Sequence, residues 1–254
     1  AGIAHEINNP NTFILANVSH VASYTEQLLN LIRHYQVMVP NPSPEMIRLI
    51  ANCDLEFVEE DLPRLLGSMQ SGSDRIQELV QSFRNFSRLG ESDKKIADLH
   101  DGINSTLVLL SYRLRKTTHR SKIQILQNYG TLPKIECFPG QLNQVFMNIL
   151  ANAIDALDQR GQYDNEEPYI KITTDMSHQS AVICIENNGI ALAPHIQNRI
   201  FEPFFTTKPV GEGAGLGLAT SYQIVVNQHQ GELHCQSKMD KSTKFIIKIP
   251  VGVD

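Results

Sequence analysis

The stretch Asn143-Gln-Val-Phe-Met-Asn148-Ile-Leu-Ala-Asn152-Ala-Ile-Asp155 carries polar side chains on one face of a predicted helix. Asn148, Asn152 and Asp155 are spaced by four and three residues, which places them one above another on that face. Carboxamide oxygens suit a hard cation such as magnesium, which keeps several waters and bridges phosphate oxygens. If this segment stood alone, a core helix with a polar exposed face would be favoured.

A glycine-rich segment lies farther along the chain. Phe201-Glu-Pro-Phe-Phe-Thr-Thr-Lys208 leads into Gly211-Glu-Gly-Ala-Gly-Leu-Gly217, and a helical pattern follows. Glycines let backbone amides approach a phosphate closely, and the start of a helix adds the positive end of its dipole. The segment predicts an anion cradle, with a surface loop as the alternative. A Walker loop is excluded because Leu218 stands where lysine would be required.

The N-terminal motif His5-Glu-Ile-Asn-Asn-Pro10 places an imidazole beside a carboxylate. A neutral imidazole is a nucleophile near neutral pH, and Glu6 could take up the proton that the imidazole releases when it attacks phosphate. Asn9 lies one helical turn from His5 and could orient a water for the reverse reaction, hydrolysis of the phosphoryl group. The alternative is an exposed helix start. A zinc protease motif is excluded because Asn9 stands where HExxH requires histidine.

The N-terminal third of the chain has a helical period. Apolar residues recur at threes and fours over 3–35 and again over about 61–89, and a proline-rich break with a short helix separates the two runs. The pattern predicts a helical hairpin. A single hairpin cannot cover its own apolar stripe, so we expect a homodimer in which two hairpins form a four-helix bundle.

After a polar linker at 89–95 the pattern changes, and we expect two domains, 1–92 and 93–254. The second domain should be an α+β sandwich with a mixed sheet, because its helices and strands do not alternate regularly. The expected helices are 99–116, 140–160 and 215–229, and the expected strands are 123–128, 169–175, 181–187 and a closing hairpin at 232–250.

Composition narrows the possible partners. A net charge of -5 and a pI near 6.0 provide no basic field for a polyanion, so nucleic acid is not an expected partner. The cysteines form no CxxC pair, and no apolar run is long enough to span a bilayer. These features predict a cytoplasmic fragment.

The order of these motifs resembles the sensor histidine kinase family, whose ATP domain has the GHKL fold shared with gyrase, MutL and heat-shock chaperone ATPases. The sequences of these motifs are also similar to those of cyanobacterial multi-sensor kinases. His5-Glu6 to Pro10 resembles the phosphoacceptor box, Asn148 and Asn152 the asparagine box, 201–208 the phenylalanine box, and 211–217 the second glycine box.

The resemblance implies ATP and Mg²⁺ as cofactors. It implies that Asn152 binds magnesium, that Asn148 and Lys208 lie near the phosphates, and that residues 190–213 form a mobile lid. The implied nucleotide-binding residues are Asn148, Asn152, Asp155, Asn187, Gly189, Lys208, Gly213, Gly215, Leu216 and Gly217. His5 would accept the γ-phosphoryl group and pass it to an aspartate of a response-regulator receiver domain, under control of a sensor domain upstream of Ala1.

The first glycine box departs from the family pattern Asp-x-Gly-x-Gly, whose aspartate accepts a bond from the adenine amino group. Here Asn187, Gly189 and Ala191 occupy the key positions. Asn187 loses the charge-assisted part of that bond, about 1 kcal/mol, and Ala191 adds a methyl group where positive φ is a possible requirement. Glu186 lies on the opposite strand face and is not expected to substitute. We expect weaker ATP binding or altered nucleotide selectivity.

Two other functions remain open at this stage. One is a degenerate kinase that docks response regulators without turnover, suggested by the altered glycine box. The other is a GHKL ATPase coupled to conformational work, which the His5 motif argues against because such an ATPase needs no phosphoacceptor hairpin.

Overall fold

The computed structural model describes residues 2–86, 93–160, 166–208, 215–238 and 242–252. The chain divides into two compact units, Ala1–Gln81 and Ser82–Asp254. We call them the helical unit and the C-terminal unit and describe each by itself. The boundary expected between residues 92 and 93 adjoins a segment outside the described residues, so that domain boundary stays a prediction.

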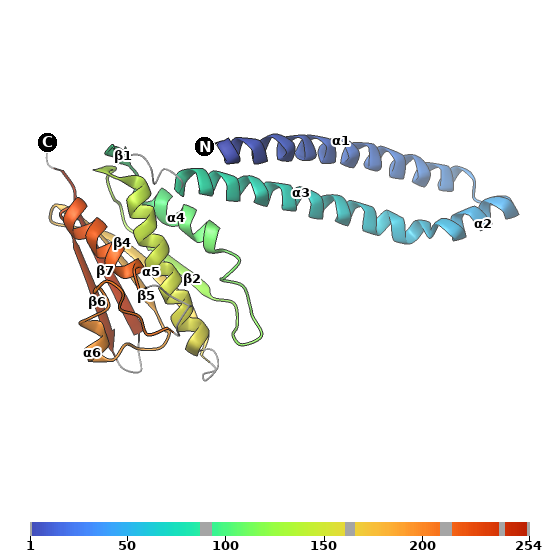
Figure 1. Cartoon of the computed structure of the whole chain (residues 1–254). Helices are drawn as coiled ribbons and strands as arrows, with labels where there is room; N and C mark the ends of the chain where they lie inside the picture. The colour runs from blue at the N-terminus through green and yellow to red at the C-terminus, as the bar shows by residue number, and fades with distance from the viewer. Residues whose placement is uncertain (1, 87–92, 161–165, 209–214, 239–241, 253–254) are drawn as a thin grey trace. The chain divides into compact units, whose positions relative to one another are not determined.

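The helical unit is a hairpin of α1 (Gly2–Met38) and α3 (Leu55–Phe86), connected through α2 (Pro44–Cys53). Figure 1 shows α1 and α3 side by side and α2 at their turn. Asn11 bonds to Ser73 near the open end, and Arg33 Nε lies 3.3 Å from Glu59 Oε2 near the turn, so the helices are antiparallel. The predicted hairpin is therefore present.

α2 starts at a serine followed by a proline, a sequence typical of a helix start. Ser43 Oγ accepts a hydrogen bond of 3.3 Å from the Met46 amide, and Pro44 occupies the first helical turn. The start expected for the second long helix, near Asp61, is wrong because α3 begins at Leu55 and carries Pro63 inside it. Strong helix formers before the proline, among them Glu56, extend the helix past the residue read as its beginning.

The C-terminal unit contains a mixed sheet with strand order β2-β4-β5-β7-β6. β2 and β4 are parallel, and the other neighbouring pairs are antiparallel. These strands are β2 (Gln124–Tyr129), β4 (Tyr169–Ser177), β5 (Ser180–Asn187), β6 (Glu232–Lys238) and β7 (Ser242–Pro250). The predicted mixed α+β architecture is confirmed. A small sheet of β1 (Lys95–Ala97) and β3 (Ile135–Cys137) was not predicted, because three residues are too few to show an alternating pattern.

The helices of this unit are α4 (Leu99–Leu110), α5 (Pro139–Arg160), the short α6 (Pro194–Gln197) and α7 (Gly217–Tyr222), which continues as the π-helical turn η2 (Gln223–Gln228). The end expected for α4, residue 116, is wrong. The buried Arg120 donates to the main-chain oxygens of Arg113 and Arg115, so its side chain holds the chain after α4 as a loop.

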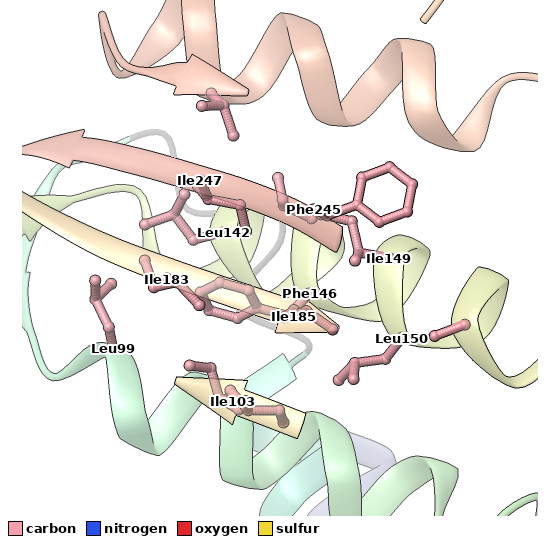
Figure 2. Packing of buried hydrophobic residues seen from close by; sticks show 14 of the residues in the cluster. Leu99, Ile103, Leu142, Phe146, Ile149, Leu150, Ile183, Ile185, Phe245 and Ile247 are labelled. Carbon is pink, nitrogen blue, oxygen red and sulfur yellow. The ribbon is translucent and has the colours of Figure 1, made fainter. Parts of the chain in front are cut away.

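The core lies between the sheet and the helices. Alternate residues of β5 and β7 are buried, and Ile183, Ile185 and Ile247 point toward Phe146 and Ile149 of α5 (Figure 2). α4 in turn packs against α5. This packing fixes α5 over β5, and both elements carry residues of the candidate site.

Candidate active site

The C-terminal unit contains a cavity of about 530 Å³ beside α5. Its walls come from α5, the loop after β5, residues 205–208, the start of α7, and β7. Pockets for small ligands commonly have this size. Its lining includes polar and charged side chains as well as a set of apolar ones.

Asn148 connects α5 to the glycine segment. Its Nδ2 donates to the main-chain oxygen of Gly217 at 2.8 Å and to Ser221 Oγ at 3.2 Å. Because the amide nitrogen makes both contacts, the Oδ1 atom keeps its acceptor capacity. Asn152 lines the same cavity one turn farther along α5. The structure thus brings together the two asparagines predicted from the sequence.

Asp155 lines the cavity and lies between two cations. It accepts hydrogen bonds from Lys208 Nζ and from Arg113 Nη2, and Arg113 also lies 3.6 Å from Asp158 Oδ2. Burial raises the pKa of Asp155, but the bonds from Lys208 and Arg113 outweigh burial and lower it below its ordinary value. Asp155 therefore stays ionised and holds Lys208 at the cavity wall.

Arg113 is a site residue that the sequence analysis missed. It was expected inside a helix running to residue 116, whereas it lies beyond the end of α4, where its guanidinium reaches Asp155. An arginine in a loop has no periodic signature, so only the tertiary structure reveals its partner.

Asn187, the last residue of β5, is the third asparagine in the cavity lining. Asn187 is 1% exposed, lines the cavity, and its Nδ2 has no hydrogen-bond partner among the described residues. Thr243 is its cross-strand partner on β7 and was also missed, because sequence gives no strand register. The apolar wall is made by Ile190, Leu192, Ile196, Ile200 and Phe245.

The altered glycine box keeps its geometry. A Cβ atom at Gly189 would lie 2.7 Å from the main-chain carbon of Ala156, so glycine is required for the approach to α5. Ala191 is not among the described residues with positive φ, so it meets no backbone strain there, contrary to the concern raised by the sequence. Glu186 lies 3.2 Å from Lys244 and does not line the cavity, as expected.

Gly215 and Leu216 line the cavity next to Gly217. Gly215 has φ +65°, and a Cβ atom there would lie 2.5 Å from the main-chain carbon of Phe204. The Phe204 amide donates to the Gly215 oxygen at 3.0 Å, so residues 204 and 215 are adjacent. Gly213 and most of the predicted glycine cradle lie outside the described residues.

The predicted phosphoacceptor motif lies on a helix. His5 is in α1, Asn9 follows one turn later, and the helix continues through Pro10. Glu6 and Asn9 are exposed. The helical backbone therefore gives positions 5 and 9 the common face that the motif requires, while their chemical roles stay predictions.

Two properties of the described part of the chain bear on metals and membranes. Its His, Cys, Asp and Glu side chains form no cluster of three suited to a metal ion, and none of its helices combines the length and apolarity needed to cross a bilayer.

Residues 138–253 match the family described as histidine kinase-, DNA gyrase B- and HSP90-like ATPase. The C-terminal unit is therefore an ATPase-type domain of this family. Over its whole length the chain is similar to sensor histidine kinases: it is 28% identical to sensor histidine kinase ZraS of Escherichia coli (strain K12) over 254 residues, which cover 100% of this chain and 45% of that protein.

Solved structures agree with this assignment. The catalytic domain of histidine kinase ThkA is 26% identical, with a TM-score of 0.53, and the match covers 63% of this chain and 96% of that one. A structure of ThkA in complex with response regulator protein TrrA shares the fold at 20% identity and a TM-score of 0.50, over 96% of this chain and 64% of that one. The chain spans less than half the length of the curated relatives it matches.

Proposed function

We propose that this chain is the kinase core of a sensor histidine kinase and that it transfers the γ-phosphoryl group of ATP to His5. The observation that carries the proposal is the cavity in the ATPase-family domain, whose lining combines charged and apolar side chains suited to the phosphates and the base of a nucleotide. The His5 motif on α1 supplies an acceptor in the same chain.

Mg²⁺ fits the asparagines of α5 that line the cavity. Amide oxygens are ligands that magnesium accepts, and a hydrated magnesium ion needs few protein ligands when phosphate oxygens supply others. Asn152 would hold the ion, and Asn148 would lie near the phosphates. The metal would neutralise charge on the phosphates, while Lys208 and the amides of Gly213, Gly215 and Gly217 would bind their oxygens.

In the transfer step, an imidazole nitrogen of His5 forms a bond to the γ-phosphorus while the bond from that phosphorus to the bridging oxygen of ADP breaks. Glu6 takes up the proton that the ring releases. Phosphohistidine then passes its phosphoryl group to an aspartate of a receiver domain. The complex of ThkA with a response regulator supports a partner of this kind. Asn9 gives the motif a second function, orienting a water that hydrolyses the phosphorylated partner.

A homodimer fits the helical unit. Large apolar side chains remain exposed along the hairpin, including Phe13, Leu28, Leu31, Leu65 and Met69. Pairing two hairpins into a four-helix bundle would bury such side chains. Sedimentation at micromolar concentration should give a dimer, and a monomer would contradict this part of the proposal.

Incubation of the chain with γ-labelled ATP and Mg²⁺ tests the kinase activity. We expect base-stable, acid-labile label on the wild type and none on His5→Gln. His20→Gln is the matched control, because His20 is an exposed histidine of the same helix and should leave labelling unchanged. Absence of label from the wild type would overturn the proposal.

A non-catalytic scaffold is supported less well. Its motive was the loss of the acid and of a glycine from the first glycine box, but Ala191 meets no backbone strain and Gly189 keeps its close approach to α5. Normal affinity for magnesium-ATP would remove the remaining motive.

A further inference from the structure

We propose that Asn187 makes the cavity accept both 6-amino and 6-oxo purine triphosphates, so that the site selects purines without separating adenine from hypoxanthine. This inference rests on the proposed function, because it assumes that the cavity holds a nucleoside triphosphate. It concerns only how the base is read.

Two neighbouring asparagines differ in their hydrogen bonds. Asn188 Oδ1 accepts from the Tyr169 amide at 2.8 Å, and its Nδ2 donates to the Glu167 oxygen at 3.0 Å. Both the oxygen and the nitrogen of its amide are therefore bonded to the main chain. Asn187 is equally buried, yet its Nδ2 has no partner in the described part of the chain. A buried donor without a partner is costly, which points to a partner supplied by a ligand.

The hydroxyl groups of Thr243 and Ser237 bond to each other. Thr243 pairs with Asn187 across the strands, and its Oγ1 lies 2.8 Å from Ser237 Oγ, in a hydrogen bond. Ser237 Oγ also accepts from the Leu192 amide at 2.8 Å. These bonds hold the cavity wall in place, and neither hydroxyl group bonds to the Asn187 Nδ2 atom.

The lining residues can hold both parts of such a ligand. Lys208, which donates to the ionised Asp155, is a cation suited to a polyphosphate. Ile190, Leu192 and Phe245 are apolar residues of the same cavity and suit the faces of a planar heterocycle. We place the phosphates at Lys208 and an edge of the heterocycle at the Asn187 amide.

An amide carries one donor group and one acceptor group, and a half-turn about its last bond exchanges their positions. Adenine offers an amino donor at position 6 and an acceptor at position 1. A 6-oxo purine offers an acceptor at position 6 and a donor at position 1. Asn187 can pair with either edge. A carboxylate has acceptors only and would face the 6-oxo oxygen with like polarity.

Calorimetric titration of the whole chain with ATP and with inosine triphosphate, both in Mg²⁺, tests the proposal. The two nucleotides differ only at positions 1 and 6 of the base. We expect wild-type affinities within about tenfold of each other, and an Asn187→Asp variant that favours ATP by at least about tenfold more than the wild type does.

Two further variants make the result specific. Asn187→Leu removes the amide with little change of size and should weaken both nucleotides while leaving their ratio near that of the wild type, which keeps the test valid if the aspartate variant fails to fold. Asn148→Ala, near the proposed phosphates, should also weaken both nucleotides alike.

A wild type that binds ATP but prefers it to inosine triphosphate as strongly as Asn187→Asp does would overturn this inference and leave the proposed function intact. A wild type that binds neither nucleotide would overturn both.

Discussion

The two units of this chain bury their apolar residues to very different extents. In the C-terminal unit Ile103, Ile149 and Ile183 are 0% exposed, and they belong to one continuous core. In the helical unit Phe13 is 69% exposed and Leu31 is 66% exposed. The C-terminal unit therefore buries a core within a single copy, whereas the hairpin carries an apolar surface that the second copy of the proposed dimer would cover.

The units also use buried polar groups differently. In the hairpin, Asn11 Nδ2 donates to the Ser73 oxygen and Ser73 Oγ donates to Asn11 Oδ1, each at 2.8 Å, which fixes the register of α1 and α3. In the C-terminal unit, Asn187 lines the cavity, and its Nδ2 has no hydrogen-bond partner among the described residues. The polar pair of the hairpin fixes structure, whereas the role proposed for Asn187 is to bind a ligand.

Truncating one phenylalanine in each unit tests the first contrast and has the largest expected effect. Phe146→Ala should lower the free energy of unfolding of the C-terminal unit by about 3–5 kcal/mol, because the removed ring leaves a cavity in the core. Phe13→Ala should leave that transition within about 0.5 kcal/mol of the wild type. Urea unfolding followed by circular dichroism measures both.

The same pair of variants separates folding from assembly. Phe13→Ala should weaken the dimer in sedimentation, whereas Phe146→Ala acts on folding. Equal losses of folding stability from the two substitutions would break the contrast between a complete core and an uncovered face.

The buried polar pair of the hairpin gives the next largest effect. Asn11→Ala should destabilise the helical unit by about 1–3 kcal/mol, because Ser73 loses the amide to which it bonds. Thermal unfolding of the helical transition measures the loss. Asn17→Ala is the control, since Asn17 is exposed on the same helix. Equal losses from the two variants would show that the pair contributes no stability of its own.

The sequence predicts most of the fold because its periodic patterns are local. The 3.6-residue period of α5 and the alternation in β5 report directly which face is buried. The start of α3 and the end of α4 could not be placed, because Pro63 and Arg120 act through context. A proline inside a helix looks like a helix start, and the loop after α4 is held by the tertiary contacts of Arg120.

The candidate site was predictable where a single element carries it. Asn148, Asn152 and Asp155 share one helix, so spacing alone groups them. Arg113 and Thr243 reach the site from a loop and from the register between two strands, and neither relation exists within a local stretch of sequence. The missing partner of Asn187 is likewise visible only in three dimensions.

Removing the charge of Asp155 tests how much a charged residue of the cavity lining contributes to the stability of the C-terminal unit. Asp155→Asn should lower stability at pH 7 by about 1 kcal/mol, since the partly exposed ion pairs with Arg113 and Lys208 are lost. The pKa of Asp155 is lowered on folding, so this contribution is present above its ordinary value of 3.8 and is lost as the pH falls through the folded value. Urea unfolding at pH 7 and in acid measures the difference.

The control for this prediction is Glu136→Gln, an exposed acid of β3. It should change stability little at either pH. A deficit of Asp155→Asn that persists unchanged in acid would show that lost packing, and not lost charge, is its cause.

The smallest expected effect concerns His229 and is a change in how steeply the folding stability falls with pH. This histidine is buried: its Nε2 accepts from the Phe138 amide at 3.0 Å, so Nδ1 carries the proton and donates to the Ile224 oxygen at 2.8 Å. Burial lowers its pKa and nearby Lys94 adds to this, against the opposing effect of the bond to Ile224. The folded state therefore favours the neutral ring.

The sign of the pH dependence follows. The stability that the neutral ring provides is present above the ordinary pKa of 6.5 and is lost as the pH falls through the lowered folded value. His229→Gln keeps a donor and an acceptor but does not titrate, so the C-terminal unit of this variant should lose less stability on acidification than the wild type. His119→Gln, at an exposed loop histidine, should keep the wild-type slope. Parallel slopes for the wild type and His229→Gln, measured by urea unfolding between about pH 7.5 and pH 5, would show that His229 does not link protonation to folding.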